Sequence, residues 1–141
     1  MPGPTVHHRL TIEWALDEGL DRVRAEQVGT ADANVDQLWP GTERWSRHFN
    51  PPATLFWTPW YFLRAVREAS PTRLGYALHC RQDAIGHGAF GLAHLRFDIG
   101  MLRRDPDDWS RMPPRVRAAI ERDTRRIMRA YLHRTARRAG G

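Results

Sequence analysis

The chain has 141 residues, a formal net charge of +6 and one cysteine, and apolar residues make up 41% of it. This length suits a single domain, 1–141, and the apolar content is enough for a sizeable core, which excludes wholesale disorder and fibrous repeats. The lone Cys80 excludes an internal disulfide and a CxxC zinc or redox pair. Any metal must therefore be held by histidine and carboxylate side chains.

The positive charge is concentrated near the C-terminus. All 22 basic residues are arginine, and residues 101–141 hold 12 of them against 5 acidic residues, while residues 1–100 hold 10 against 11. We expect the polar, proline-containing segment 105–114 to link the preceding part of the domain to a basic amphipathic helix over 115–138. Its arginines suit nucleic-acid phosphates, an anionic surface or simply a solvated helix face.

Nothing in the sequence predicts a membrane segment. No stretch approaches the roughly 20 apolar residues that a spanning helix needs, and Met1 to His8 lacks the profile of a signal peptide. We therefore expect a cytoplasmic protein without a transmembrane segment, and the oligomeric state is left open.

The spacing of apolar residues predicts helices along the whole chain, because it follows the helical period and no alternating strand pattern lasts more than about four residues. Thr5 can cap the first helix and Gly29 follows its end, while Pro51-Pro52 and Pro71 separate the later ones. The expected fold is all-α, a compact bundle of about five helices. The main predicted helices cover residues 5–28, 53–69, 71–85, 89–102 and 115–138, with a short one over 32–39.

Two features of these helices are interpreted as core rather than as functional sites. The aromatic run of 56–62 is typical of a buried helix face more than of a substrate platform. Cys80 points about 100° around its helix from the neighbouring His79 and is expected to be a small buried hydrophobe, although Cys/His catalysis stays open.

Histidine and aspartate recur at helical spacing in the second half of the chain. His79, Asp83 and His87 are each four residues apart, and His94 and Asp98 repeat the interval. Residues four apart share one face of a helix, so an imidazole and a carboxylate there can chelate one divalent ion. A single pair of this kind is more often a surface hydrogen bond, but two pairs with a histidine between them favour a metal site.

The order of these residues resembles a known family. His8, then Asn34-Val35-Asp36, His48-Phe49, Leu78-His79-x-x-x-Asp83-x-x-x-His87 and His94-x-x-x-Asp98 are similar to the zinc-dependent phospholipase C and single-strand nuclease superfamily. That superfamily has an all-helical fold that holds up to three zinc ions. The resemblance covers roughly residues 7–98, and its most specific part is Leu78 to His87.

The resemblance implies a ligand set for each ion. One zinc would be held by Asp36, His48, His79 and Asp83, a second by His87, His94 and Asp98, and a third by His8 together with a bridging Asp83. The family members expose an N-terminal tryptophan, and this chain begins Met-Pro-Gly-Pro. We therefore expect two zinc ions rather than three, and iron or manganese would accept the same donors.

These expectations predict a metal-dependent enzyme. Divalent ions of this kind hydrolyse phosphate esters, with Asp36 or Asp83 orienting the attacking water and Arg47 and Arg81 neutralising the developing charge. A repurposed member acting on a biosynthetic metabolite would use the same Lewis-acid site. The alternative is a non-catalytic basic helical module that binds nucleic acid or an anionic surface, and a third option keeps the metal only as a structural staple.

Overall fold

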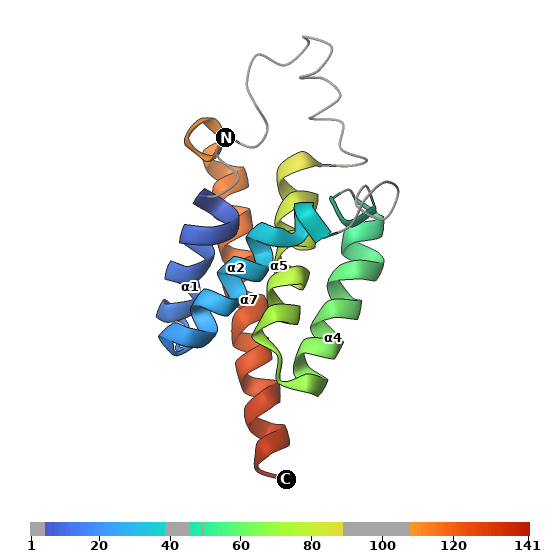
Figure 1. Cartoon of the computed structure of the whole chain (residues 1–141). Helices are drawn as coiled ribbons and strands as arrows, with labels where there is room; N and C mark the ends of the chain where they lie inside the picture. The colour runs from blue at the N-terminus through green and yellow to red at the C-terminus, as the bar shows by residue number, and fades with distance from the viewer. Residues whose placement is uncertain (1–4, 39–45, 49, 89–107) are drawn as a thin grey trace.

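The computed structural model describes residues 5–38, 46–48, 50–88 and 108–141, and every regular element within these ranges is a helix (Figure 1). The prediction of an all-α chain is therefore confirmed. The elements are the π-helix η1 (Thr5–Leu10), α1 (Thr11–Asp17), α2 (Arg22–Leu38), the π-helix η2 (Ala53–Trp57), α4 (Thr58–Glu68), α5 (Pro71–His87), the 3-10 helix η3 (Trp109–Arg111) and α7 (Pro114–Ala139).

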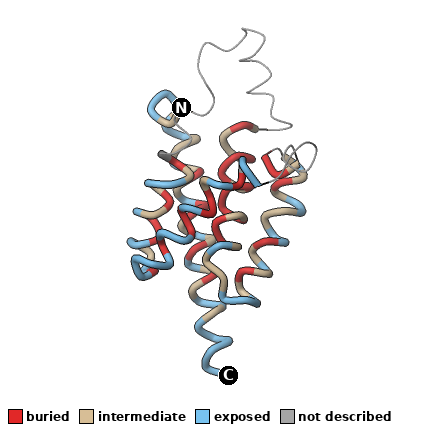
Figure 2. The backbone as a smooth tube through the Cα atoms, viewed as in Figure 1, coloured by how far each residue is buried: buried red, intermediate tan, exposed pale blue. Residues whose placement is uncertain are grey.

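Helix α5 lies at the centre of the arrangement and packs against α2, α4 and α7 (Figure 1). Ser70 caps its start by accepting a hydrogen bond from the Arg73 backbone N–H, and Pro71 occupies the first turn, where a missing N–H costs nothing. Most of its inward positions are buried, with Leu74 and Leu78 fully so, as the red stretches of Figure 2 show. The helix predicted over 71–85 is confirmed and continues to His87.

The first predicted helix is wrong in one respect, since the chain turns at Gly19 and not at Gly29. Gly19 has a φ of +103°, which favours glycine, and it separates α1 from α2. Gly29 lies inside α2, where a Cβ atom would come within 2.5 Å of Ile12 Cγ1. The sequence pattern identified Gly29 alone, because only tertiary packing distinguishes a turn from a close approach between helices.

The aromatic run of 56–62 divides between two sides of its helix. Tyr61 is buried in a small cluster with Cys80, and Cys80 is fully buried, as expected for a small hydrophobe. Phe56 and Trp60 are 54% and 47% exposed, so the interpretation of the run as core holds for only part of it.

Helix α7 matches the predicted basic helix and belongs to the same core as the other helices. Its residues Ile120, Met128 and Tyr131 are buried in the main apolar cluster, and Arg125 and Arg129 on its outer side form ion pairs with Glu18. None of the helices in the described ranges is long and apolar enough to cross a membrane.

Replacing Gly75 by alanine tests the contact between α2 and α5. An added Cβ would collide with the backbone oxygen of Val28 and lie 2.7 Å from Ala31 Cβ, so we expect a loss of about 1–3 kcal/mol in the free energy of unfolding. Gly86→Ala in the same helix is the matched control, because its Cβ would meet only Met112 Cε at 3.7 Å and Ile120 Cδ1 at 3.9 Å. Alanine there should stabilise the helix by about 0.5–1 kcal/mol. Equal urea midpoints for the two variants would contradict the close approach.

Candidate metal centre

Five histidine and aspartate side chains meet inside the bundle, and we call them the His/Asp cluster: His7, Asp32, His48, His79 and Asp83. They come from η1, from α2, from the helical residues 46–48 and from α5, and they lie toward the C-terminal end of α5, at the top of Figure 1. Four of the five are buried and His7 is nearly so. Segments far apart in the sequence thus supply one polar site within an apolar core.

His79 has its two ring nitrogens in different surroundings. Nδ1 lies 2.7 Å from the backbone oxygen of Asp32, which only accepts hydrogen bonds, so Nδ1 is the protonated nitrogen. Nε2 lies 3.2 Å from Asp83 Oδ2 and 3.3 Å from His48 Nδ1. In its neutral form His79 therefore presents the Nε2 lone pair to these two groups, an arrangement usual for metal-binding histidines.

Asp83 is the centre of the cluster, because histidine nitrogens face both of its oxygens. Oδ2 contacts His48 Nδ1 and His79 Nε2, and Oδ1 lies 3.1 Å from His7 Nε2. His87 follows one turn later on α5, with its Nδ1 4.0 Å from Asp83 Oδ2. A buried carboxylate in such surroundings needs positive charge nearby, supplied either by protons on the imidazoles or by a cation.

A hydrogen-bonded chain fixes the orientation of His7. The amide nitrogen of Gln82 donates to the hydroxyls of Thr11, at 3.1 Å, and Thr124, at 3.2 Å, so its Oε1 faces His7 Nδ1 at 2.8 Å as an acceptor. Asp32 Oδ1 accepts from the same nitrogen at 3.0 Å, and Thr11 donates to Asp32 Oδ2 at 2.8 Å. His7 therefore carries a proton on Nδ1 and turns Nε2 toward Asp83.

Without metal, the cluster holds protonated imidazoles next to an ionised carboxylate. Burial lowers the pKa of His79, but the neighbouring Asp83 and Asp32 carboxylates together outweigh this and raise that pKa from 6.5 to about 9. The pKa of His7 is also well above its usual value, because Asp83 and Asp32 outweigh burial in the same way. Burial raises the pKa of Asp83, and the surrounding His79, His87 and His7 hold it well below its usual value. Protons therefore occupy the imidazoles of His79 and His7 near neutral pH, and a metal ion has to displace them.

A cleft gives access to one side of the cluster. It encloses about 290 Å³ of space including its open mouth, and its polar walls are His7, Gln82, Asp83 and His87. The apolar walls are Val6, Gly86, Met112 and Ile120. Since His7 and Asp83 Oδ1 lie on this side, a small ligand can reach them from solvent.

The structure brings together three of the residues expected to bind metal: His48, His79 and Asp83. His87 lines the cleft beside them. His8 does not join them: it is exposed on η1, and the cluster contains His7 instead. Two neighbouring residues point about 100° apart on a helix, so His7 faces the cluster while His8 faces outward.

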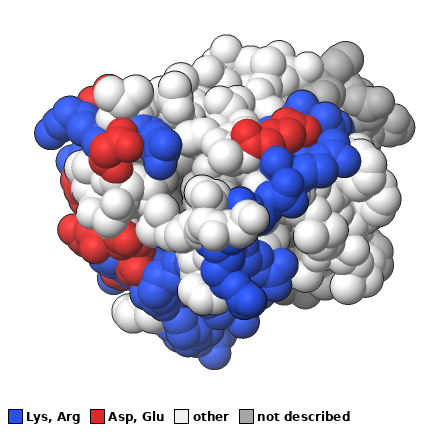
Figure 3. Space-filling model, turned by 90° about the horizontal axis from the view of Figure 1, so that it is seen from below, with Lys and Arg blue, Asp and Glu red and all other residues white. Residues whose placement is uncertain are grey.

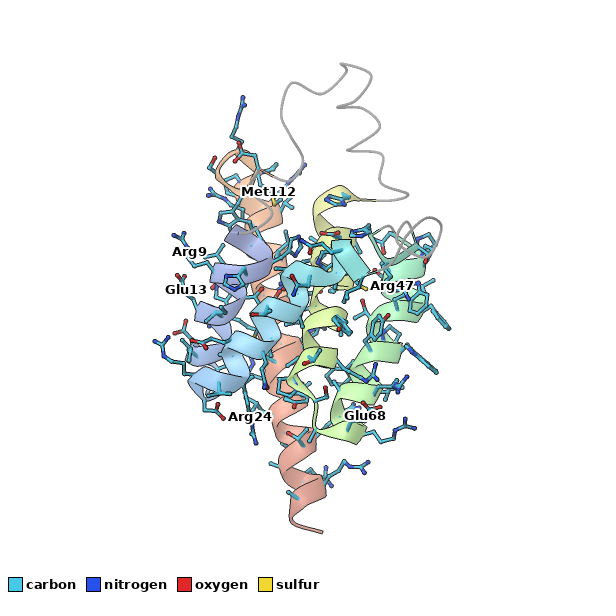
Figure 4. The ribbon with its side chains drawn as sticks, viewed as in Figure 1. Arg9, Glu13, Arg24, Arg47, Glu68 and Met112 are labelled. Atoms are coloured by element: carbon cyan, nitrogen blue, oxygen red, sulfur yellow. The ribbon has the colours of Figure 1, made fainter. Side chains whose placement is uncertain are left out.

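Both arginines expected to bind substrate have protein partners. Arg47 is buried at the end of α4 that lies toward the cluster (Figure 4), where it donates to the Tyr61 hydroxyl at 3.0 Å and lies 3.8 Å from the centre of the Trp57 ring. Arg81 pairs with Asp123 through Nε at 2.9 Å and Nη2 at 2.5 Å, joining α5 to α7. Their observed contacts are structural.

The remaining expected ligands cannot be placed. His94 and Asp98 lie outside the described residues, as does the helix predicted over 89–102, and the side chain of Asp36 is likewise outside them, although its backbone belongs to α2. Cys80 is fully buried, and burial strongly raises the pKa of its thiol, which disfavours the thiolate form.

Sequence reasoning missed His7, Asp32 and Gln82. One signal was available for Asp32: it lies four residues before Asp36 on the same helix, so the two share a face. Nothing local distinguishes Gln82 from an ordinary surface glutamine, because its role depends on Thr11 and Thr124 in distant helices.

Comparisons of the chain with protein-family models, curated proteins and solved structures gave no match.

Proposed function

We propose that this protein is a metal-dependent hydrolase of phosphate esters, with zinc as the first candidate and iron or manganese as the others. The observation that carries the proposal is the convergence of three donor atoms, with His79 Nε2 3.2 Å from Asp83 Oδ2 and 3.3 Å from His48 Nδ1. Ligand atoms around a tetrahedral zinc ion, each about 2.0–2.1 Å from the metal, are roughly 3.3 Å apart. The side chains therefore have the donor types of such a site, and two of the three donor pairs have its spacing. The third pair, His48 Nδ1 and Asp83 Oδ2, is in direct contact without metal and would separate around an ion.

The surroundings of His79 also fit this role. Its Nδ1 donates to the Asp32 backbone oxygen at 2.7 Å, which fixes both the tautomer and the ring plane. A second set of donors, His7, Asp32 and His79, lies close enough to hold an ion. Because His79 already uses Nδ1 for this hydrogen bond, the set of His48, His79 and Asp83 is the better site.

A second ion fits on the side of the cleft. Asp83 Oδ1 and His7 Nε2 are 3.1 Å apart there, and His87 lines the same cleft. Asp83 would then hold one ion with each oxygen. This is the bridging role that the resemblance to the phospholipase C and nuclease superfamily gives it toward the third ion, here with His7 in place of His8. Asp36, His94 and Asp98 stay proposed ligands on the strength of that resemblance.

The residues that line the cleft have distinct roles in the proposed reaction. Divalent ions there would polarise a phosphate oxygen and lower the pKa of a water molecule. Asp83, fixed by three imidazoles, orients the attacking water, and His87 lies within the same cleft as a proposed metal ligand. A repurposed member that acts on a phosphorylated biosynthetic metabolite would use the same residues of the cleft.

The proposal is tested by metal content together with hydrolysis. Chelator-treated protein reloaded with zinc should retain close to two equivalents by elemental analysis, and should hydrolyse bis(p-nitrophenyl) phosphate, a generic phosphodiester, only after reloading. His133→Ala, on the exposed side of α7, is the control and should behave like the parent chain. Protein that cannot be loaded with zinc, iron or manganese would refute the metal site, and loaded protein inactive on phosphate esters would leave the metal as a structural staple.

A further inference from the structure

An apolar stripe runs along the outer side of η2 and α4, away from the core. It consists of Phe56, Trp60 and Leu63, spaced four and three residues apart and thus on one side of the helix, together with Leu55 at its start. Their exposed fractions are 54%, 47% and 59% for the first three and 75% for Leu55. The opposite side of α4 is the one that packs on α5, through Tyr61 and Ala65. The helix therefore has two apolar faces, and the core uses only one of them.

The exposed aromatic rings are ordered against each other. Phe56 and Trp60 stack with their ring planes 9° from parallel and their centres 6.1 Å apart, and the Arg64 guanidinium lies 5.9 Å from the centre of the Trp60 ring. Arg67 continues the stripe, four residues after Leu63 and 66% exposed in its side chain. Cationic groups thus flank the apolar stripe at the C-terminal end of α4.

The end of the bundle where α4 and α7 finish is strongly basic. Arg64, Arg67 and Arg73 surround a single acid, Glu68. Arg134 lies across the Phe62 ring of α4 at 5.5 Å. Further along α7, two more arginines are exposed, Arg137 and Arg138, and within the described ranges neither pairs with an acid. Figure 3, viewed toward this end, shows the arginines massed over the centre and lower part of the surface beside uncharged side chains.

We propose that the outer side of α4 and this basic end form a docking surface for an anionic lipid bilayer. Tryptophan, phenylalanine and leucine on one side of a helix, flanked by arginines, have the chemistry of a helix that lies in the membrane interface. The apolar side chains enter the boundary between headgroups and acyl chains, while Arg64, Arg67 and Arg134 contact lipid phosphates.

Two other occupants fit less well. In a two-fold contact between copies of the chain, the arginines that flank the stripe would be brought toward their own counterparts, and like charges there disfavour association. Single-stranded nucleic acid would stack on Phe56 and Trp60 but would gain nothing from the exposed Leu55 and Leu63. A bilayer satisfies the aromatic, aliphatic and cationic groups together.

Flotation with vesicles tests the proposal on the full chain. The protein should float with vesicles of equal parts phosphatidylcholine and phosphatidylglycerol, and only weakly with phosphatidylcholine alone. The double variant Trp60→Ser, Leu63→Ser should bind at least about tenfold more weakly, since it removes two exposed apolar side chains that would enter the bilayer interface. Val23→Ser is the matched control, because Val23 is 65% exposed on α2 and lies outside the stripe.

Several outcomes would overturn the docking surface. These are equal binding of the double variant and the control, no flotation with anionic vesicles, or a Trp60-dependent dimer or nucleic-acid complex in its place. Binding should be the same with a chelator present, because the stripe shares no residue with the His/Asp cluster. Success or failure here is therefore independent of the proposed hydrolase.

Discussion

Replacing Asp83 by asparagine is expected to lower the affinity for zinc by at least about a hundredfold and to abolish metal-dependent hydrolysis. Asparagine keeps the shape of the side chain but removes the charge that faces His7, His48 and His79. Equilibrium competition with a chromogenic zinc chelator measures the affinity. The metal-free variant should also lose about 3–5 kcal/mol of unfolding free energy near pH 6, because protonated buried imidazoles lose their counter-charge.

The variant Asp123→Asn is the control for Asp83→Asn, because it removes a carboxylate from an ion pair and not from the proposed metal site. Asp123 is also a buried carboxylate, but its partner is Arg81, and it lies on α7 outside the cluster. This control should lose stability and keep the zinc affinity of the parent chain. If both variants lost only stability and bound zinc equally well, Asp83 would be a structural counter-ion to the histidines and the proposed hydrolase would have no metal centre.

The second large effect is the pH dependence of the free energy of unfolding. Above about pH 6.5 it should have opposite signs in the metal-free and the zinc-loaded protein. The pKa of His79 in the metal-free fold is about 9, against 6.5 for the unfolded chain, so the folded state binds the proton more tightly. The resulting stabilisation is complete below about pH 6.5 and disappears as the pH rises through 9. The difference between these two values corresponds to roughly 3 kcal/mol, and His7, whose pKa is also raised, adds to it in the same direction.

Asp83 acts at the other end of the pH range. Its pKa in the fold is well below the usual value of 3.8. Its contribution to the free energy of unfolding is therefore fully present above pH 3.8 and is lost as the pH falls toward the folded-state pKa. The metal-free protein should therefore be most stable between about pH 4 and 6.5. Urea unfolding in the presence of a chelator, at pH 5, 7 and 9, measures this profile.

Zinc should reverse the alkaline part of the profile. Binding displaces the protons of His79 and His7, so the metal stabilises the fold more as the pH rises from 6.5 toward 9. His133→Gln, on the exposed side of α7, should leave both profiles unchanged. A metal-free protein whose stability is flat from pH 6 to 9 would contradict the proposed coupling between His79 and Asp83.

The sequence by itself determined the all-helical character of the chain and the most specific part of the site. Helical periodicity, proline and capping residues are local signals, so α5 was predicted within two residues and α7 closely. The pair of His79 and Asp83 could be found for the same reason, since two residues four apart on a helix share a face whatever the rest of the fold does. Their burial and mutual contact agree with that prediction.

Only the tertiary structure decided the features that depend on which helix faces pack against each other. It selected His7 over His8 and brought Asp32 and Gln82 from separate helices to fix the orientation of His7. It also divided one aromatic run into a buried and an exposed face, because α5 covers only one side of α4. Periodicity gives the spacing of residues around a helix, but the direction in which the helix turns each face is set by packing against segments distant in the sequence, which no local pattern contains.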